Sequence, residues 1–371
     1  MMYEMKGIRY AEGLLKFLLA TAMAWLGCIA LVSCDQGDTN AGEAEANITL
    51  TLCLKGADKI NNTRIGQPFV KTLASRGEGV ETEDPGTEME NSIDFSRFHV
   101  VFYDANQQMA GILQNMVLVH LGGNIYRLTG SLPVSNKVLV GNHFVGKMVV
   151  YANFVMSEAD LQKGYDDEII AQKAFNYEAN PKYLPMWGVQ KVDFTLAAGK
   201  RKDFPDIDLL RAVAKVKVNL SNEMKNNGWS IHSMKLINYN NKGYCMPDKY
   251  TDCEQTASLT HEEFEHFLES KQTDSITMNE NSPIYLPEYQ NNGKEDVNKC
   301  VIKLKLARNG KVESDKEYTL RFIDYTDGTT INDIVRDHYY IFEVYKGSNG
   351  QNLVKLTVRK WNVRDHDEIV M

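Results

Sequence analysis

The stretch Ala212-Val-Ala-Lys-Val-Lys-Val-Asn-Leu220 indicates the fold class of this chain most directly. From Ala214 to Leu220 every second residue is apolar, and polar residues lie between them. A period of two is the period of a β-strand, because successive side chains point to opposite faces of a sheet. The stretch therefore predicts a strand with one face on a core and the other, with Lys215 and Lys217, in solvent.

The same alternation recurs elsewhere in the chain. Residues 300–306 and 354–358 both place an apolar residue at every second position, and the residues between them are polar or basic apart from Val301. Residues that tolerate positive φ or bond their own backbone separate such segments, as at Gly122-Gly-Asn124, Arg308-Asn-Gly310 and Ser348-Asn-Gly350. Short alternating strands separated by turns predict a mainly β chain built from antiparallel sandwiches.

Two short helices are expected between the strands. Ser157 with Asp160, and Thr260 with Glu263, have the spacing of a capping box at the start of a helix. The first helix is predicted to run to about residue 174. Both are expected to lie on the surface and to cover a sheet.

The N-terminus has the charge order of a secretory signal, in which basic residues precede an apolar stretch. The apolar part, residues 17–33, is a little shorter than the roughly 20 residues of a spanning helix. It ends in Leu31-Val32-Ser33-Cys34, which resembles the bacterial lipobox, whose cysteine is acylated and becomes the mature N-terminus. We expect a signal peptide at residues 1–33 and lipid on Cys34 that holds the protein at a membrane. An uncleaved anchor helix is the less favoured alternative.

The segment after Cys34 is polar, and residues 34–45 are predicted to be a tether. Its acidic residues resemble the surface-export signal of Bacteroidetes lipoproteins. Residues 1–33 carry a net charge of +1 and the whole chain −8, so the mature chain is near −9. A surface that acidic repels phosphate groups, and nucleic acid is therefore not an expected partner.

The mature chain is longer than one core usually serves, which predicts two domains. The best boundary follows the charged run Lys200 to Asp203, where Phe204-Pro205 restricts the backbone and a strong strand pattern begins. We expect an N-terminal β-sandwich domain at residues 46–203 and a C-terminal one at residues 204–371.

A second polar stretch runs from Arg76 to Asn91 and is rich in glutamate and glycine. Such a composition cannot bury much apolar area. The stretch is therefore predicted to be an exposed loop that proteases can reach.

Four cysteines lie after Cys34, at positions 53, 245, 253 and 300. An oxidising compartment would permit disulfides, and Cys245 and Cys253 are near enough in sequence to close a small loop. Buried or free thiols are an equally good interpretation, because spacing alone does not choose the pairing. The four form no C-x-x-C pair, so a zinc ribbon is not expected.

No pattern of catalytic or metal-binding residues stands out. His261 and His266 are five residues apart on a predicted helix and point about 140° away from each other, which does not suit one metal ion. The acidic stretches at residues 324–333 and 365–368 lack the spacing of a calcium loop. Nucleophile-elbow, phosphate-loop and dinucleotide motifs do not occur. We expect no cofactor and no enzymatic activity. An active site assembled from scattered carboxylates, as in glycosidases, is the alternative that the sequence leaves open.

Aromatic residues are frequent, and several stand within strand-like segments, including Trp187, Trp229, Trp361 and the run Tyr339 to Phe342. Core filling is the favoured interpretation, because these residues follow the strand alternation. A platform on which sugar rings stack is the functional alternative.

Several segments resemble, in their order along the chain, the fimbrillin family of Bacteroidales, which contains subunits and accessory proteins of surface fimbriae. The matching segments are Ala46–Leu54, Arg76–Val80, Glu88–Ile93, Phe98–Tyr103, Val150–Asn153, Leu184–Gly188, Leu209–Val216, Arg336–Tyr340 and Val358–Asn362. They cover nearly the whole mature chain. The resemblance implies two tandem transthyretin-like sandwiches and a structural or adhesive role.

In that family, stalk subunits are exported as lipoproteins and cut after an arginine that precedes the second strand. The cut removes the first strand and opens a hydrophobic groove. The resemblance implies that Arg76 is the matching arginine. The removable first strand would carry its apolar residues at Ile48, Leu50, Leu52 and Leu54.

A terminal strand from a neighbouring subunit fills the groove in that family. A sandwich that lacks an edge strand exposes apolar side chains and unpaired amides, and an incoming strand satisfies both. In this chain the candidate donor is the last strand, residues 353–370. Its candidate groove-filling residues are Val354, Leu356, Val358 and Trp361.

The resulting expectation is a fimbrial subunit or accessory protein, anchored by lipid at the outer membrane on the cell surface and contributing to adhesion. Its expected partners are other fimbrial subunits and a host or bacterial surface receptor. Two alternatives stay open. The short tether after Cys34 favours an uncleaved anchor, because the family's anchor proteins keep their lipid and are not cut. A surface glycan-binding lipoprotein would instead need exposed aromatic residues.

Overall fold

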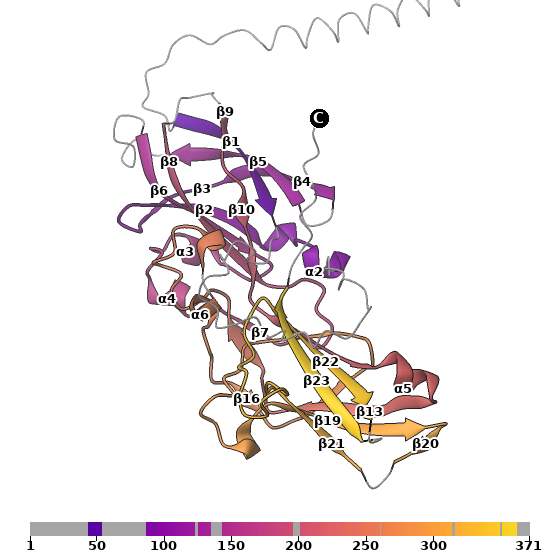
Figure 1. Cartoon of the computed structure of the whole chain (residues 1–371). Coiled ribbons are helices and arrows are strands. Elements are labelled where there is room, and N and C mark those ends of the chain that lie inside the picture. The colour runs from indigo at the N-terminus through magenta and orange to yellow at the C-terminus, as the bar shows by residue number, and fades with distance from the viewer. Residues whose placement is uncertain are drawn as a thin grey trace, which may run out of the picture. The chain divides into compact units, whose positions relative to one another are not determined.

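The computed structural model describes residues 44–53, 87–122, 125–134, 143–195, 201–259, 261–313, 316–348 and 351–361. Strands dominate these residues, and the helices between them are short (Figure 1). The strands form four larger sheets and two small two-stranded ones. The prediction of a mainly β chain with antiparallel sandwiches and a few short helices is confirmed. In the described part, no helix has the length and apolar character needed to cross a membrane.

The first two sheets form one sandwich. The first contains β10 (Ile207–Asp208), β1 (Ala44–Cys53), β5 (Ile125–Val134) and β4 (Gln114–Gly122) in that order, with β9 (Arg201–Asp203) also paired to β1. The second has the order β11 (Leu210–Arg211), β8 (Met186–Thr195), β6 (His143–Ala152), β2 (Phe98–Asp104) and β3 (Met109–Ile112).

The second sheet of this sandwich is buried on both faces. On one face, residues such as Phe102 and Val150 pack with Leu128 of β5 in the core between the sheets. On the other face, neighbouring residues such as Tyr103 and Tyr151 join a second apolar cluster. Consecutive residues of a strand point to opposite faces, so burial on both sides explains the near-continuous apolar run of β2.

The other two large sheets form a second sandwich. One has the order β18 (Ile284–Leu286), β12 (Ala214–Leu220), β22 (His338–Lys346) and β23 (Asn352–Lys360). The other has the order β17 (Ile276–Met278), β13 (Trp229–Ile237), β19 (Val301–Arg308) and β20 (Lys311–Val312), with β21 (Tyr318–Arg321) also on β19. Most neighbours are antiparallel, whereas β12 and β22 run parallel.

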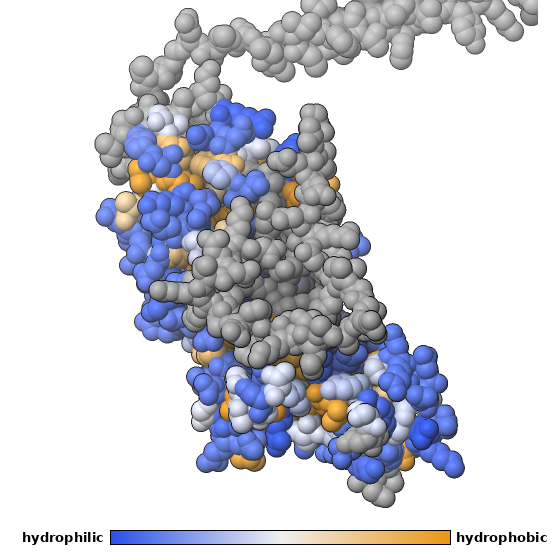
Figure 2. All heavy atoms as spheres, in the orientation of Figure 1, coloured by the Kyte–Doolittle hydropathy of each residue, from blue (hydrophilic) through white to orange (hydrophobic). Residues whose placement is uncertain are grey.

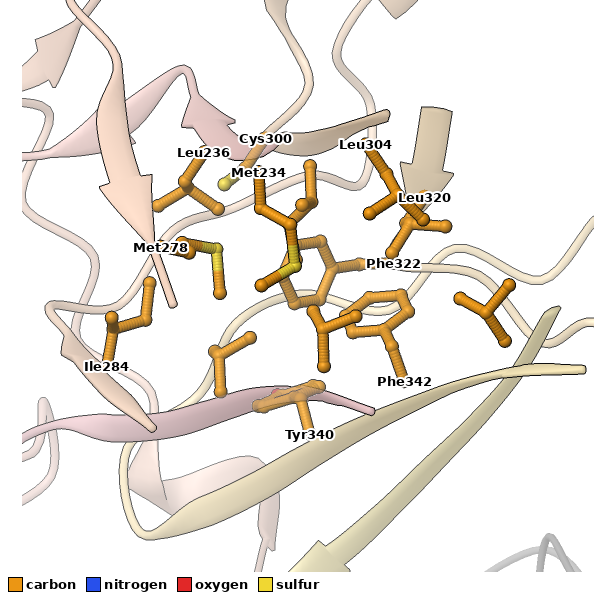
Figure 3. Packing of buried hydrophobic residues seen from close by; sticks show 14 of the residues in the cluster. Met234, Leu236, Met278, Ile284, Cys300, Leu304, Leu320, Phe322, Tyr340 and Phe342 are labelled. Atoms are coloured by element: carbon orange, nitrogen blue, oxygen red, sulfur yellow. The ribbon is translucent and has the colours of Figure 1, made fainter. Parts of the chain in front are cut away.

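The core of the second sandwich confirms the predicted alternation. Figure 3 shows Leu304 and Leu320 from one sheet gathered with Tyr340 and Phe342 from the other. Leu304 and its neighbours two residues away on β19 are fully buried, while the lysines between them are half-buried. The strand pattern read from the sequence therefore places the correct residues in this core.

One prediction about β12 is wrong. Lys215 was expected in solvent, but only 3% of it is exposed. Its Nζ lies 2.8 Å from Glu90 Oε1 and its ammonium lies 5.1 Å from the ring centroid of Trp361. Residues distant in sequence therefore cover the face of β12 that the local pattern assigns to water.

The predicted exposed loop from Arg76 to Asn91 is also corrected in its described part. Residues 88–91 form the short helix α2 (Glu88–Asn91), which Thr87 caps. Glu90 and Asn91 are buried in it. Polar residues can be buried when they are paired, and both side chains have partners in the second half of the chain.

The helices are shorter than predicted. The capping box of Ser157 is present, but its helix α3 spans only Glu158–Leu161, and a separate turn, α4 (Glu168–Ala171), follows. Asp167 caps α4, so the chain restarts instead of continuing one helix. The helix α6 (His261–Phe264) is equally short, and the amide of His266 donates to Glu288 Oε2 (3.2 Å).

The remaining elements connect the larger parts. They are α5 (Asn222–Asn226), the pair β14 (Tyr239–Asn240) and β16 (Lys271–Gln272), the pair β7 (Ala174–Asn176) and β15 (Lys242–Tyr244), and three 3-10 helices (Phe95–Arg97, Thr256–Ser258 and Asp296–Asn298). The strands β10 and β11 still pair with the first two sheets, and all strands of the second sandwich follow them. The division into domains at residues 203 and 204 stays a prediction.

Three of the tryptophans and three of the cysteines lie inside. Trp187 and Trp361 are fully buried and Trp229 nearly so, which confirms core filling for these three. Cys245 and Cys253 are free thiols and do not form the predicted small-loop disulfide. Cys300 is also a free thiol. Burial raises the pKa of the Cys245 and Cys253 thiols to about 12. Cys53 lies in β1, but its side chain is outside the described part.

Candidate functional site: the first strand, the last strand and the buried junction

The first strand has one long partner. β1 pairs with β5 antiparallel over its whole length, from Ala44 opposite Val134 to Cys53 opposite Ile125. On its other side it pairs in parallel with only three residues of β9 and two of β10. Figure 1 shows β1 next to β5 in the upper sheet. β1 is thus a full member of its sheet, and one of its two sides is held only by short segments.

The register of β1 fits the predicted first strand. Leu50 lies opposite Leu128 and Leu52 opposite Tyr126. Leu128 and Tyr126 belong to the core of the first sandwich. Two apolar positions of the predicted strand are therefore paired with core residues of β5. Ile48 lies opposite Gly130, and Leu54 is outside the described part.

A glycine allows the segment beside β1 to approach the second sheet. A Cβ on Gly188 of β8 would stand 2.5 Å from the carbonyl oxygen of Asp208 in β10. No side chain fits at that distance, so only glycine lets the backbone of residues 207–209 lie there. Ile207 and Leu209 reach the sandwich core in consequence.

The last strand is built into its own sandwich. β23 pairs with β22 over nine residue pairs, from His338 opposite Lys360 to Lys346 opposite Asn352, and it is at the edge of its sheet (Figure 1). The candidate groove-filling residues Val354, Leu356 and Val358 are half-buried against the core of the second sandwich. As a donor, β23 would have to leave this pairing.

Trp361 ends the strand in a buried position. It clusters with Leu184, Val213 and Tyr285, and its ring stacks on that of Tyr285 at 5.7 Å between centroids. The guanidinium carbon of Arg211 lies 4.7 Å from the Trp361 ring centroid. Trp361 is therefore enclosed by residues of its own chain.

A buried network of charges surrounds Trp361. The Glu90 carboxylate accepts a hydrogen bond from the Tyr285 hydroxyl (2.5 Å) besides its ion pair with Lys215. Arg211 donates to Asn91 Oδ1 (2.8 Å) and pairs with Asp337 Oδ1 at 3.4 Å. We call the residues Glu90, Asn91, Arg211, Lys215, Tyr285, Asp337 and Trp361 the buried junction.

A third buried ion pair adjoins the two of the junction. Arg336 Nη2 lies 2.6 Å from Glu288 Oε2, and the Arg336 amide donates to Glu288 Oε1 (3.1 Å). The same guanidinium donates to the carbonyl oxygens of Tyr244 and Cys245. Next to it, Asp337 has a φ of +53°, which lets its amide reach the Val213 carbonyl.

Sequence reasoning found the segments of the junction but not its chemistry. Several segments that carry the family resemblance meet here: Glu88–Ile93, Leu184–Gly188, Leu209–Val216, Arg336–Tyr340 and Val358–Asn362. Charged residues inside apolar strand patterns, as in Arg211-Ala-Val-Ala-Lys215, were the available signal. The junction fixes α2, the first described element after the predicted cut, to the rest of the chain.

Other predicted site residues fall outside the described part. These are the lipobox residues Leu31, Val32 and Ser33, the lipidation residue Cys34, and the cleavage residue Arg76. Each stays a prediction. Among the residues that are described, no group of three His, Cys, Asp or Glu side chains could hold a metal ion.

A pocket of about 220 Å³ lies beside the junction. Its walls come from residues 153–155, 174–178 and 181–185, together with Arg97, Val213 and Tyr285. Sequence reasoning missed it, because its residues belong to separate segments. On the face that Figure 2 shows, the described surface is mostly hydrophilic with small hydrophobic patches, as strands with polar outer faces require.

Comparison with known protein families gives one match over most of the chain. Residues 79–367 match the model of a family described as fimbrillin-A associated anchor proteins Mfa1 and Mfa2. No curated protein matches.

Solved structures with a similar fold come from Bacteroidales. A candidate cell adhesion protein of Parabacteroides distasonis is 12% identical with a TM-score of 0.51, and the match covers 88% of this chain and 100% of the other. A fimbrial assembly protein of the same organism is 13% identical with a TM-score of 0.50, over 86% and 96%. At such identities the likeness concerns the fold.

Proposed function

Because the chain belongs to the family of fimbrillin-A associated anchor proteins, we propose that it is a lipid-anchored fimbrial protein whose β1 is exchanged for a strand of a neighbouring subunit. Membership of the family makes it a component of surface fimbriae that associates with other fimbrial subunits. The observation that supports the exchange is the pairing of β1. It pairs with β5 along one side and, on the other side, with β9 and β10 through five parallel residue pairs.

Loss of β1 would have two physical consequences. The ten paired residues of β5 would present unpaired amides and carbonyls along one edge. Core residues opposite β1, such as Leu128 and Leu132, would gain exposure to water, and full exposure of each leucine costs about 1.5–3 kcal/mol. A strand with the same apolar alternation restores both kinds of contact.

The buried junction supports this order of events. A cut at Arg76 would separate β1 from everything after it, while α2 would stay attached through Glu90 and Asn91. The second sandwich would be unaffected, because β1 has no pairing with its sheets in the described part. The cut chain therefore keeps a fold that can accept a strand.

The second candidate function is an uncleaved anchor. The observation that favours it is the position of β23, whose apolar residues and Trp361 already pack in their own chain. A subunit whose last strand stays paired within its own chain donates no strand to the next subunit and therefore ends a polymer. In this case Arg76 would not be processed.

Cleavage and polymerisation test the two candidates. Purified full-length lipoprotein is treated with an arginine-specific protease, and the products are analysed by N-terminal sequencing and gel electrophoresis. We expect a new N-terminus at Gly77 and a ladder of polymers. Arg76→Ala should abolish both, whereas the matched variant Arg64→Ala should keep both. A folded protein that is not cut, or is cut without polymers, identifies the anchor.

A peptide distinguishes strand exchange from other association. A synthetic peptide of residues 44–54 should occupy the groove of the cut protein and stop the ladder. The same peptide with Leu50→Asp places a charge opposite Leu128 and should leave the ladder intact. Equal effects of the two peptides would contradict strand exchange.

Lipid attachment at Cys34 is tested separately. Cells that express the protein are labelled with a palmitate analogue, and we expect the label in the outer-membrane fraction. Cys34→Ser should remove the label, while Cys28→Ser, inside the predicted signal, should retain it. Label on the Cys34→Ser variant would refute the assignment.

A further inference from the structure

We propose that the pocket beside the buried junction binds an acidic sugar unit, a uronic or sialic acid residue of a surface glycan. The inference deepens the adhesive part of the proposed function and rests on the surface location for its biological meaning. Binding itself needs neither cleavage nor polymerisation, so it can succeed or fail independently of strand exchange.

The size and lining of the pocket suit one sugar ring. Its volume is about 220 Å³, and aromatic residues from several segments line it. Phe175, Tyr177 and Tyr183 are half-buried, while Tyr285 is buried at the junction. Sugar rings have a face of C–H groups that packs on aromatic rings and an edge of hydroxyl groups that needs polar partners. Tyr183 offers both surfaces, whereas Tyr177 offers its ring, because its hydroxyl is buried.

Two cations give the pocket its preference for a carboxylate. The guanidinium carbon of Arg97 lies 5.8 Å and the Lys182 Nζ lies 5.1 Å from the Tyr183 ring centroid. Arg97 bonds Asp94 through Nε (2.7 Å), and in the described part its two terminal nitrogens have no further partner. Glu178 is the only acid among the described lining residues. A guanidinium with free terminal nitrogens binds a carboxylate well.

The pocket is fixed before any ligand arrives. Asn153 donates through Nδ2 to the carbonyls of Ser92 (2.9 Å) and Leu184 (2.7 Å), and its Oδ1 accepts from the Asp94 amide (2.7 Å). Its φ of +68° is one that asparagine tolerates. One side chain thus ties the backbone at residues 92–94 and at Leu184 to its own segment beside the pocket, which lowers the entropy cost of binding.

The opposite wall is held by strand pairing. β7, residues 174–176, pairs with β15 of the second half, and the amide of Tyr177 donates to the Asn241 carbonyl (2.7 Å). The wall that carries Phe175 and Tyr177 is therefore part of the folded chain. An acidic peptide is the competing occupant, and a peptide probe separates it from a sugar.

Binding is measured on uncut full-length protein by calorimetry and ligand-observed NMR. The probes are glucuronic acid and N-acetylneuraminic acid, with glucose as the neutral control. Both acids should bind, and glucose should bind at least about tenfold more weakly, because it lacks the carboxylate. Lys182→Ala and Tyr183→Ala should each weaken acid binding about tenfold. Lys163→Ala, another exposed lysine that lines no part of the pocket, should leave it unchanged.

Circular dichroism and urea midpoints equal to those of the unaltered protein show that each variant is folded. Equal binding of glucose and the acids, or unchanged binding by folded Lys182→Ala and Tyr183→Ala variants, would overturn the proposal. Binding of an acetylated Asp-Tyr dipeptide amide in place of both sugars would also overturn it and would assign the pocket to a peptide. A polymer ladder without sugar binding would refute only this inference.

Discussion

Replacement of Lys215 by methionine tests the buried junction most directly. Lys215 is buried in β12, with its Nζ 2.8 Å from Glu90 Oε1 and 4.6 Å from the ring centroid of Tyr339. Methionine keeps a similar length and apolar stem but removes the charge. The Glu90 carboxylate, which has no exposed surface, would lose this ammonium partner.

The expected cost follows from the burial of both partners. Removing one member of a buried ion pair costs about 3–5 kcal/mol, because the other charge stays buried without it. Replacing both charges leaves no such penalty, and the double variant Lys215→Met with Glu90→Gln should lie within about 1–2 kcal/mol of the unaltered protein. The two single losses should therefore exceed the loss in the double variant.

Urea unfolding followed by tryptophan fluorescence measures these free energies, since Trp361 lies inside the junction. Lys217→Met is the matched control, because Lys217 lies on the same strand and is only half-buried. It should change the free energy of unfolding by less than about 0.5 kcal/mol. Two results would refute a buried ion pair between Lys215 and Glu90. In one, Lys215→Met lowers the free energy of unfolding no more than Lys217→Met does. In the other, the losses of the two single variants add in the double variant.

Three further predictions concern stability and reactivity. Trp361→Ala should lower the free energy of unfolding by about 3–5 kcal/mol and remove much of the near-ultraviolet circular dichroism; a small loss would show that the end of β23 is not held at the junction. Burial lowers the pKa of His99 and His266 below 6.5, so as pH falls these histidines take up protons in the unfolded chain before they do so in the folded one. Urea midpoints should therefore fall as pH drops from 7.5 to 5.5, and a midpoint that does not change with pH would contradict this. Cys245 and Cys253, with pKa values of about 12, should react slowly with iodoacetamide at pH 8 until urea is added, and fast native labelling would refute their burial.

The sequence was sufficient wherever the determining interactions are local. The alternation in β12 and β19 predicted the residues that face the core, because the pleat of a strand has a period of two whatever the rest of the chain does. The capping box at Ser157 was also correct, since its hydrogen bonds join residues three positions apart. Its helix length was not, because the cap of Asp167 restarts the chain in a second turn.

Tertiary contacts decided the features that matter for function. The burial of Lys215 depends on Glu90 and Trp361, which lie more than 100 residues away in sequence on either side. No local pattern can report such a partner, and so the lysine was assigned to water. The pocket was missed for the same reason. Arg97 is distant in sequence from Lys182 and Tyr183, and the fold brings both cations to the Tyr183 ring.

By itself, the sequence determined that the chain is made of strands in which apolar and polar residues alternate, and which face of such a strand is apolar. It also predicted an exported lipoprotein with a first strand of apolar alternation. The tertiary structure decided that β1 has one long partner and that β23 and Trp361 belong to their own sandwich. The physical reason is that backbone periodicity is a property of neighbouring residues, whereas pairing, burial and charge neutralisation depend on residues that only the folded chain brings together.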